Sequence, residues 1–522
     1  MAFVDQLEKL RDISLENPVA LAAAGIGAVV LLAWARKGSQ GPFPPGPKGH
    51  PLVGSLFSWP SHQEWLTFTK WREEYGDIVY ANVAGTKIMV LNSPEAAKAL
   101  LDDRGAIFSD RPHLHFANDI IGWKDSPIMC LASHPYFKPS RRMMLSAVGS
   151  RTALEGYVHM EEHEVHRFLN RVIDDPDKVE YYLRKLAGTI ILRVVYGYDV
   201  VPGDDEYVDL IERVNNDLNK AATPGNFMVD FIPALAYVPR WFPGTGWMRA
   251  TDRMRKNLDD VLTKPINFVK NQLAAGTARP SFVGSEITRP DWDEKKEQHL
   301  LAWTAEALYT GGADTSVSAT YTFFLLMTLY PEIQARAQAE IDAVIGPDAL
   351  PTWADRERLP YVDALIKEMM RWAPVAPQAL PHAAAEDSTY NGYFIPKNTI
   401  VIANVYGYTR DPKVYPDPDR FDPERFLGPN PQADPRDFVF GFGRRVCPGR
   451  QLGEASLYLV TSNSLATLHV SKKIGKDGVP ITPKVEYTGG AVVYPTAFEC
   501  AIKPRNAKAE ALIRSVHDAP FP

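Results

Sequence analysis

The residue with the clearest chemical potential is a lone cysteine in a glycine-rich loop. The stretch 440–449 reads FGFGRRVCPG, which places Cys447 after two arginines and two residues before Gly449. Gly443 and Gly449 permit tight turns and a close approach of the backbone to a flat ligand. A helical segment follows, and N–H groups near a helix start can stabilise a thiolate. The loop therefore indicates a ligating thiolate, the alternative being a buried structural cysteine in a turn.

A second group of residues lies inside a long apolar stretch, residues 293–330, that ends at Pro331 and predicts a core helix. In its middle, Gly311 and Gly312 are followed by Ala313, Asp314 and Thr315. Two glycines and two polar residues are costly inside an apolar helix, so we expect a kink or an opening there. The alternative is a helix-packing site with a solvated aspartate.

The loop resembles the haem-binding loop of the cytochrome P450 family, F-x-x-G-x-R-x-C-x-G, with every position matched. The resemblance implies a haem b cofactor with Cys447 as the axial thiolate and only protein ligand of the iron. It also implies that Arg445 bonds a haem propionate, that Phe440 packs near the sulfur, and that Gly449 lies against the cofactor.

The same resemblance extends to the middle of the predicted core helix. There it implies a catalytic acid–alcohol pair, in which Thr315 contacts bound dioxygen and Asp314 relays protons with water. Glu368 and Arg371, spaced for one helix face, resemble part of the family's Glu–Arg–Arg clamp, with Arg425 as the third member. The clamp is expected to be structural.

Two further propionate contacts are implied by the resemblance. One is His382, for which a satisfied loop histidine is the alternative. The other is Arg141, from the family pattern W-x-x-x-R, where Phe137 stands in place of the tryptophan. A phenyl ring has no N–H to donate, so the usual indole contact is missing. Pro139 predicts that the helix here begins later than in the family pattern.

The resemblance implies a mainly α fold with small β-sheets, the triangular helical haem domain of the P450 fold, preceded by one transmembrane helix. Local signals predict a strand hairpin at 77–92 around Gly85, a helix capped by Ser93, and helices at 332–345 and 359–372. Seven prolines in residues 411–437 predict packed coil.

The first 54 residues predict an anchor and a spacer. Residues 18–35 carry no charge and, as a helix, would span about 27 Å, close to the thickness of a bilayer core. Arg36 and Lys37 follow, so the positive-inside rule places the bulk of the chain in the cytosol. We expect a lumenal segment at 1–17, an anchor at 18–35, a basic and proline-rich linker at 36–54, and a single catalytic domain at 55–522. The endoplasmic reticulum is the expected membrane.

Composition excludes several classes of protein. The net charge of −6 gives no sign of nucleic-acid binding, and three cysteines are too few for a disulfide framework or a four-thiolate cluster. No flavin or nicotinamide motif is present, so electrons are expected from a separate NADPH–cytochrome P450 reductase. The predicted activity is oxidation of a lipophilic small molecule with O2, in terpenoid-like fungal secondary metabolism. The alternatives are xenobiotic or lipid oxidation, a reductase-independent isomerase or peroxygenase, and a non-catalytic haem protein.

Overall fold

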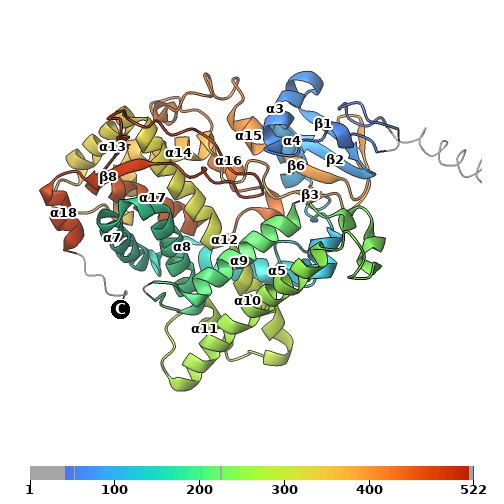
Figure 1. Ribbon diagram of the computed structural model, residues 1–522, viewed down its shortest axis with the longest axis horizontal. Coiled ribbons are helices and arrows are strands. Elements are labelled where there is room, and N and C mark those ends of the chain that lie inside the picture. Colours follow the sequence, from blue (N-terminus) through green and yellow to red (C-terminus); the bar gives the residue numbers. More distant parts are fainter. Residues whose placement is uncertain (1–40, 52, 202, 224–225, 516–520, 522) are drawn as a thin grey trace, which may run out of the picture.

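A computed structural model describes residues 41–51, 53–201, 203–223, 226–515 and 521 of the 522-residue chain. Its outline is three-cornered, with the largest sheet at one corner and helices α11 and α18 at the other two (Figure 1). The helices are α3 Glu64–Tyr75, α4 Pro94–Ala97, α5 Phe137–Val148, α6 Arg151–Glu155, α7 Val158–Asp174, α8 Val179–Tyr196, α9 Glu206–Ala222, α10 Trp247–Ala275, α11 Phe282–Ile287, α12 Glu294–Leu329, α13 Pro331–Val344, α14 Pro360–Trp372, α15 Val405–Thr409, α16 Arg436–Val439, α17 Arg450–Thr467 and α18 Ala507–Arg514. The strands are β1 Ile78–Val83, β2 Thr86–Leu91, β3 His382–Ala383, β4 Ser388–Tyr390, β5 Tyr393–Ile395, β6 Ile400–Ala403, β7 Leu468–Lys472 and β8 Cys500–Pro504.

The largest sheet has the order β1-β2-β6-β3. Strands β1 and β2 form the predicted antiparallel hairpin, and its turn uses Ala84 and Gly85 at positive φ. Ser93 caps the next helix by accepting a hydrogen bond from Ala96 N–H, as predicted. Strand β3 also bridges to Asp110, which brings His382 beside the segment that follows α4.

Helix α12 is the predicted core helix, and it runs through the middle of the molecule (Figure 1). Residues 301–310 are buried, and so is most of 317–328, but residues 311–316 between them are all at least partly accessible. The predicted opening is absent, because the helix is continuous from Glu294 to Leu329. Packing against α8 and α17 on its flanks outweighs the low helix propensity of the two glycines. The accessible middle of a buried helix must face space inside the protein.

The predicted clamp is confirmed. Arg371 donates two hydrogen bonds of 2.7 Å to the Glu368 carboxylate, and Arg425 Nε lies 3.4 Å from the same group. Arg371 also donates to the carbonyls of Thr409 and Pro418, so it ties α14 to the proline-rich segment. That segment contains only short helical turns.

The predicted start of the helix that carries Arg141 is wrong. Helix α5 begins at Phe137, with Pro139 inside its first turn. The first four N–H groups of a helix have no acceptor within the helix, so proline removes nothing there.

Among the residues described, no helix is both long enough and apolar enough to cross a membrane. The predicted segments at 1–17 and 18–35 lie outside the described residues. The described part of the linker contains no helix and lies along β1, where Tyr80 N–H donates to Pro45 O and the Phe43 ring stacks on Tyr80.

Two fully buried carboxyl groups make stability depend on pH. Burial raises the pKa of Glu161 and of Glu306 to about 8, and each has one oxygen without a hydrogen-bond partner among the described residues. The native state therefore keeps two protons that the unfolded chain releases above pH 4.5. For each group, the free energy of unfolding should fall by roughly 1.4 kcal/mol per pH unit between pH 4.5 and 8, and then level off.

We expect the Glu306→Gln variant to lose part of this pH dependence, because its amide does not ionise. Thermal unfolding at pH 5 and pH 8, at one scan rate, measures the effect. The melting temperature of the variant should fall less between the two values than that of the wild type. Glu357→Gln, at an exposed position on the turn η8, Trp353–Arg358, is the control. Equal slopes for Glu306→Gln and the wild type would contradict a protonated Glu306.

Candidate active site

The Cys447 loop is a tight turn between α16 and α17. Cys447 N–H donates to Phe440 O at 2.8 Å. Gly443 has a φ of +52°, and a Cβ there would lie 2.2 Å from Leu101 O, so only glycine fits. Gly449 has an ordinary φ of −88°, yet a Cβ added to it would meet nothing within 4 Å. Gly449 therefore borders open space rather than making a special turn.

The Cys447 thiol is accessible although the loop lies in the interior. Dense surrounding protein raises the pKa of this thiol, while the Gly449 N–H and the positive charges of Arg141 and Arg450 act in the opposite direction. A thiol that is closely surrounded and still accessible lines an internal space. The Phe440 ring faces the Arg450 guanidinium at 5.3 Å.

Arg445 extends from this loop into a shell of main-chain carbonyls. Its guanidinium donates to Ser109 O and Pro127 O at 2.8 Å and to Cys130 O at 2.5 Å. The Phe137 ring lies 4.0 Å below it, so the phenyl ring that replaces the expected tryptophan supports this arginine. Burial lowers the pKa of Arg445 to about 10.

Two more arginines surround the same loop. Arg141, on α5, donates to Val446 O at 2.6 Å. Arg111 donates to Ile128 O, Leu380 O and Pro381 O, and its pKa is well below the usual range because of burial and the charges of Arg445 and Arg141. In the part of the chain that the structure describes, none of the three guanidinium groups forms an ion pair. We call Arg111, Arg141 and Arg445 the arginine cluster.

His382 lies beside the arginine cluster. Its Nδ1 lies 2.6 Å from Phe108 O, and the ring is almost fully buried. Burial, reinforced by the charges of Arg111 and Arg445, lowers the pKa of His382 to about 3. The imidazole is therefore neutral, and any bond it makes to an anion is that of a neutral donor.

These residues fit a haem. An accessible thiol would ligate the iron, and Gly449 and Gly311 each border open space, since a Cβ on either glycine would meet nothing within 4 Å. The arginine cluster holds three largely buried positive charges without an ion pair among the described residues, and Asp110 is a carboxylate whose charge reaches only Arg445 of the three. Buried unpaired charge is costly, so the cluster favours an anionic group such as two propionates.

Asp314 and Thr315 lie in the accessible middle of α12. Thr315 Oγ1 donates to Gly311 O at 2.8 Å. The Tyr494 hydroxyl donates to the Asp314 carboxylate, and the Arg184 guanidinium lies 5.1 Å from the Tyr494 ring centroid. Burial raises the pKa of Asp314 to about 6, against the opposing effects of Arg184 and Asn219. Asp314 can therefore gain and lose a proton near neutral pH.

The structure joins Cys447, Arg445, Arg141 and His382 through the loop and the carbonyls around it. Within the described ranges, no hydrogen bond links Asp314 or Thr315 to that group. Sequence reasoning missed Arg111, Tyr494 and Arg184. None of them has a local signature, because each acts on partners that lie far away along the chain.

Comparisons with known proteins agree on one family. Residues 44–495 match the family described as cytochrome P450. The chain is 43% identical to cytochrome P450 monooxygenase 208 of Postia placenta, over 94% of this chain and 97% of that protein. It is 39% identical to cytochrome P450 monooxygenase claR of Ampulloclitocybe clavipes, over 97% and 95%. It is 35% identical to O-methylsterigmatocystin oxidoreductase of Aspergillus flavus, over 92% and 91%.

The contact between Tyr494 and Asp314 predicts a shift in the pKa of the carboxyl. Tyr494→Phe removes a donor that stabilises the carboxylate, so the pKa of Asp314 should rise further above 6. Arg184→Met should act in the same direction by removing a positive charge. Infrared titration of the protonated carboxyl band, assigned by its loss in Asp314→Asn, measures both.

Tyr198→Phe is the matched control, because that hydroxyl bonds Asp205 instead. It should leave the Asp314 band unchanged. A lower Asp314 pKa in Tyr494→Phe would contradict the assigned contact.

Proposed function

The chain belongs to the cytochrome P450 family, and we propose that it oxidises a lipophilic small molecule with O2 and NADPH-derived electrons. Members of this family are haem-thiolate monooxygenases, so the cofactor is haem held by a cysteine thiolate. The observation that carries the proposal is the accessible Cys447 thiol beside an arginine cluster without a carboxylate partner.

Each residue of the site has a role in this proposal. Cys447 ligates the iron, and the bound haem thiolate supplies the electron donation that favours cleavage of the O–O bond. Arg445 and Arg141 hold the propionates, with Arg111 adding positive charge. His382 is a neutral donor at the same edge.

In this proposal, Asp314 and Thr315 in the middle of α12 deliver protons. Asp314, with a pKa of about 6, can take a proton from water and pass it on, and Tyr494 fixes the direction of its carboxylate. Thr315 bonds Gly311 O at present, and a rotation of its side chain would turn the hydroxyl toward the space beside Gly311. In this role it positions water and the incoming proton.

The substrate is proposed from the apolar segments that the family places around the pocket. These are the loop 114–128, the segment 375–380 and the turn 489–496, with apolar residues Ile120, Ile121, Trp123, Ala376, Val492 and Val493. Two of the segments meet, because Val493 N–H donates to Val375 O. One relative is named for O-methylsterigmatocystin, which supports a fungal secondary metabolite as the class of substrate.

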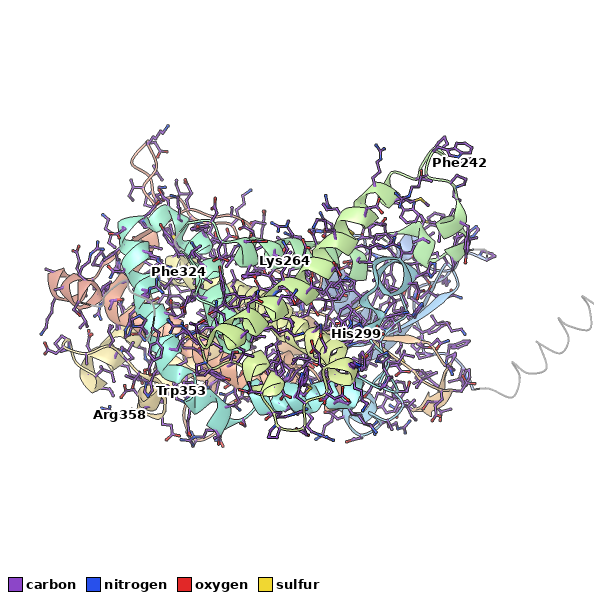
Figure 2. All side chains as sticks on the ribbon, turned by 90° about the horizontal axis from the view of Figure 1, so that it is seen from below. Phe242, Lys264, His299, Phe324, Trp353 and Arg358 are labelled. Carbon is purple, nitrogen blue, oxygen red and sulfur yellow. The ribbon has the colours of Figure 1, made fainter. Side chains whose placement is uncertain are left out.

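We further propose that the protein lies on the endoplasmic reticulum membrane, with residues 18–35 as the anchor and a cytosolic reductase as electron donor. Five large apolar side chains in the segment 228–242, which precedes α10, are exposed: Met228, Ile232, Tyr237, Trp241 and Phe242. Figure 2 shows Phe242 at the end of a segment that projects from the body of the protein. Sedimentation with vesicles tests this: a soluble full-length chain in the absence of detergent would refute the anchor.

The arginine cluster should decide how firmly haem is held. Arg445→Leu should lower haem occupancy most, Arg141→Leu less and His382→Ala least, because Arg445 is fixed by the loop that carries the ligand and a charge-assisted bond outweighs a neutral one. The haem-to-protein ratio after purification and the rate of haem transfer to apomyoglobin measure this.

Arg410→Leu is the matched control for general destabilisation, since Arg410 is also bonded to main-chain carbonyls, at Arg371 and Trp372. It should retain haem better than Arg445→Leu. Wild-type retention in Arg445→Leu together with loss in Arg141→Leu would reverse the ranking.

Thr315→Ala should keep haem and substrate binding while electrons are diverted to hydrogen peroxide. The measurement is the ratio of product to NADPH consumed, with a P450 reductase present. Thr320→Ala, a buried threonine with the same i−4 bond on α12, is the control. An unchanged ratio in Thr315→Ala would remove this hydroxyl from proton delivery, and no NADPH consumption by the wild type would contradict the proposed electron source.

A further inference from the structure

A second group of potential ligands lies between α4 and α5, apart from the Cys447 loop but in and beside the loop 114–128 whose apolar residues we placed around the substrate. His113, His115 and Asp119 bring two imidazole nitrogens and one carboxylate oxygen to within 4.8 Å of one another. His113 Nε2 lies 2.8 Å and His115 Nδ1 2.7 Å from the same oxygen, Asp119 Oδ2. Three ligand atoms of this kind, converging on one point, match the protein ligands of a tetrahedral zinc site with one open position.

A helical turn and a side-chain hydrogen bond order the backbone around the three ligands. His115–Ile121 is a helical turn, η3, which ends at Gly122 with a φ of +114°. Asn118 Oδ1 accepts a hydrogen bond from Leu114 N–H, between the two histidines. His115 and Asp119 therefore come from one turn, and His113 lies two residues before it, so the ligands need no rearrangement of distant segments.

A second carboxylate makes the surroundings negative. Phe116 N–H donates to Asp230 Oδ1 at 2.7 Å, and Asp230 Oδ2 is buried without a hydrogen-bond partner among the described residues. The two histidines lie close enough for their charges to lower the pKa of Asp230, against burial, which raises it. The carboxylates of Asp119 and Asp230 thus both lie beside the two imidazoles, and a cation is the kind of group that such surroundings favour.

The same contacts connect the cluster to another part of the fold. The Phe116 ring stacks on Phe227 with 3.5 Å between ring centroids, next to the turn η6, Met228–Asp230. Arg255 on α10 donates to Ile120 O. An ion held by η3 would therefore stiffen a segment that is already joined to η6 and α10.

We propose that His113, His115 and Asp119 bind a divalent transition-metal ion of the Zn²⁺ class, with water as the fourth ligand. Imidazole nitrogens select such ions over Mg²⁺ and Ca²⁺, which prefer oxygen ligands. In the metal-free protein Asp119 bonds both rings. The ion replaces these hydrogen bonds, and each nitrogen–oxygen separation widens from 2.7–2.8 Å to about 3.3 Å, as Zn–N distances of about 2.0 Å require.

A similar-looking group in the same chain is the internal control. His134 and His299 flank Asp125, with ring nitrogens at 3.2 Å and 4.0 Å from its oxygens. Both nitrogens of His299 are already engaged, Nδ1 with the Tyr136 hydroxyl and Nε2 with Trp303 N–H. His299 therefore has no free lone pair, and this group does not present three ligands. Figure 2 marks the position of His299.

The experiment is a calorimetric titration of the untagged, haem-loaded protein with Zn²⁺, with Mg²⁺ as the comparison ion. The wild type should bind one Zn²⁺ and no Mg²⁺ under the same conditions. His113→Ala and Asp119→Asn should each weaken Zn²⁺ binding by at least about tenfold, since even outer contacts of a metal site have effects of this size. His299→Ala should bind Zn²⁺ like the wild type.

A second readout locates the ion. Zn²⁺ should slow amide hydrogen exchange in residues 113–121 of the wild type, and of His299→Ala, but not of Asp119→Asn. Wild-type affinity equal to that of His113→Ala, or loss of binding in His299→Ala, would overturn the proposal. Neither readout needs substrate or reductase, so the proposed function can fail without affecting the test.

Discussion

Three buried guanidinium groups that share no carboxylate are the constraint on which the rest of the site depends. Arg111, Arg141 and Arg445 donate to main-chain carbonyls, and burial lowers the pKa of each, with neighbouring arginine charges adding to the effect at Arg111 and Arg445. Such charge is tolerated where an anion compensates it. The same groups anchor the Cys447 loop, since Arg141 bonds Val446 O and Arg445 crosses to Ser109 and Cys130. In the proposed function, the charge that would bind propionates therefore also positions Cys447.

The remaining elements hold that arrangement in place. The Glu368–Arg371–Arg425 clamp is buried and ties α14 to the coil that leads into the Cys447 loop. Helix α12 forms the other part of the site. It is continuous, and its middle is accessible. Asp314 lies there with a raised pKa, and its partner Tyr494 comes from the C-terminal turn. The residues that hold the Cys447 loop and the residues around Asp314 therefore come from different elements.

Features with local signatures could be predicted from the sequence. The Cys447 loop, the hairpin around Gly85, the cap at Ser93 and the clamp each rest on residue types at short spacing or on a family motif. The predicted start of α5 is wrong, because proline in the first turn of a helix removes no hydrogen bond within the helix. Arg111 and Tyr494 could not be found, since Arg111 meets Leu380 and Tyr494 meets Asp314 only after folding. The anchor at 18–35 and the roles assigned to Asp314, Thr315 and His382 remain predictions.

The central claim is that Cys447 is the thiolate ligand of a haem held by this cluster. The absorption spectrum of the reduced carbonyl complex tests it most directly, because a strongly red-shifted Soret band requires thiolate ligation. The account predicts this band for the wild type and for the Cys130→Ala and Cys500→Ala variants, because both cysteines are buried and the Cys130 carbonyl that bonds Arg445 is kept in alanine. It predicts loss of the band in Cys447→Ala. The same band retained in Cys447→Ala, in protein that still contains haem, would show that another residue ligates the iron.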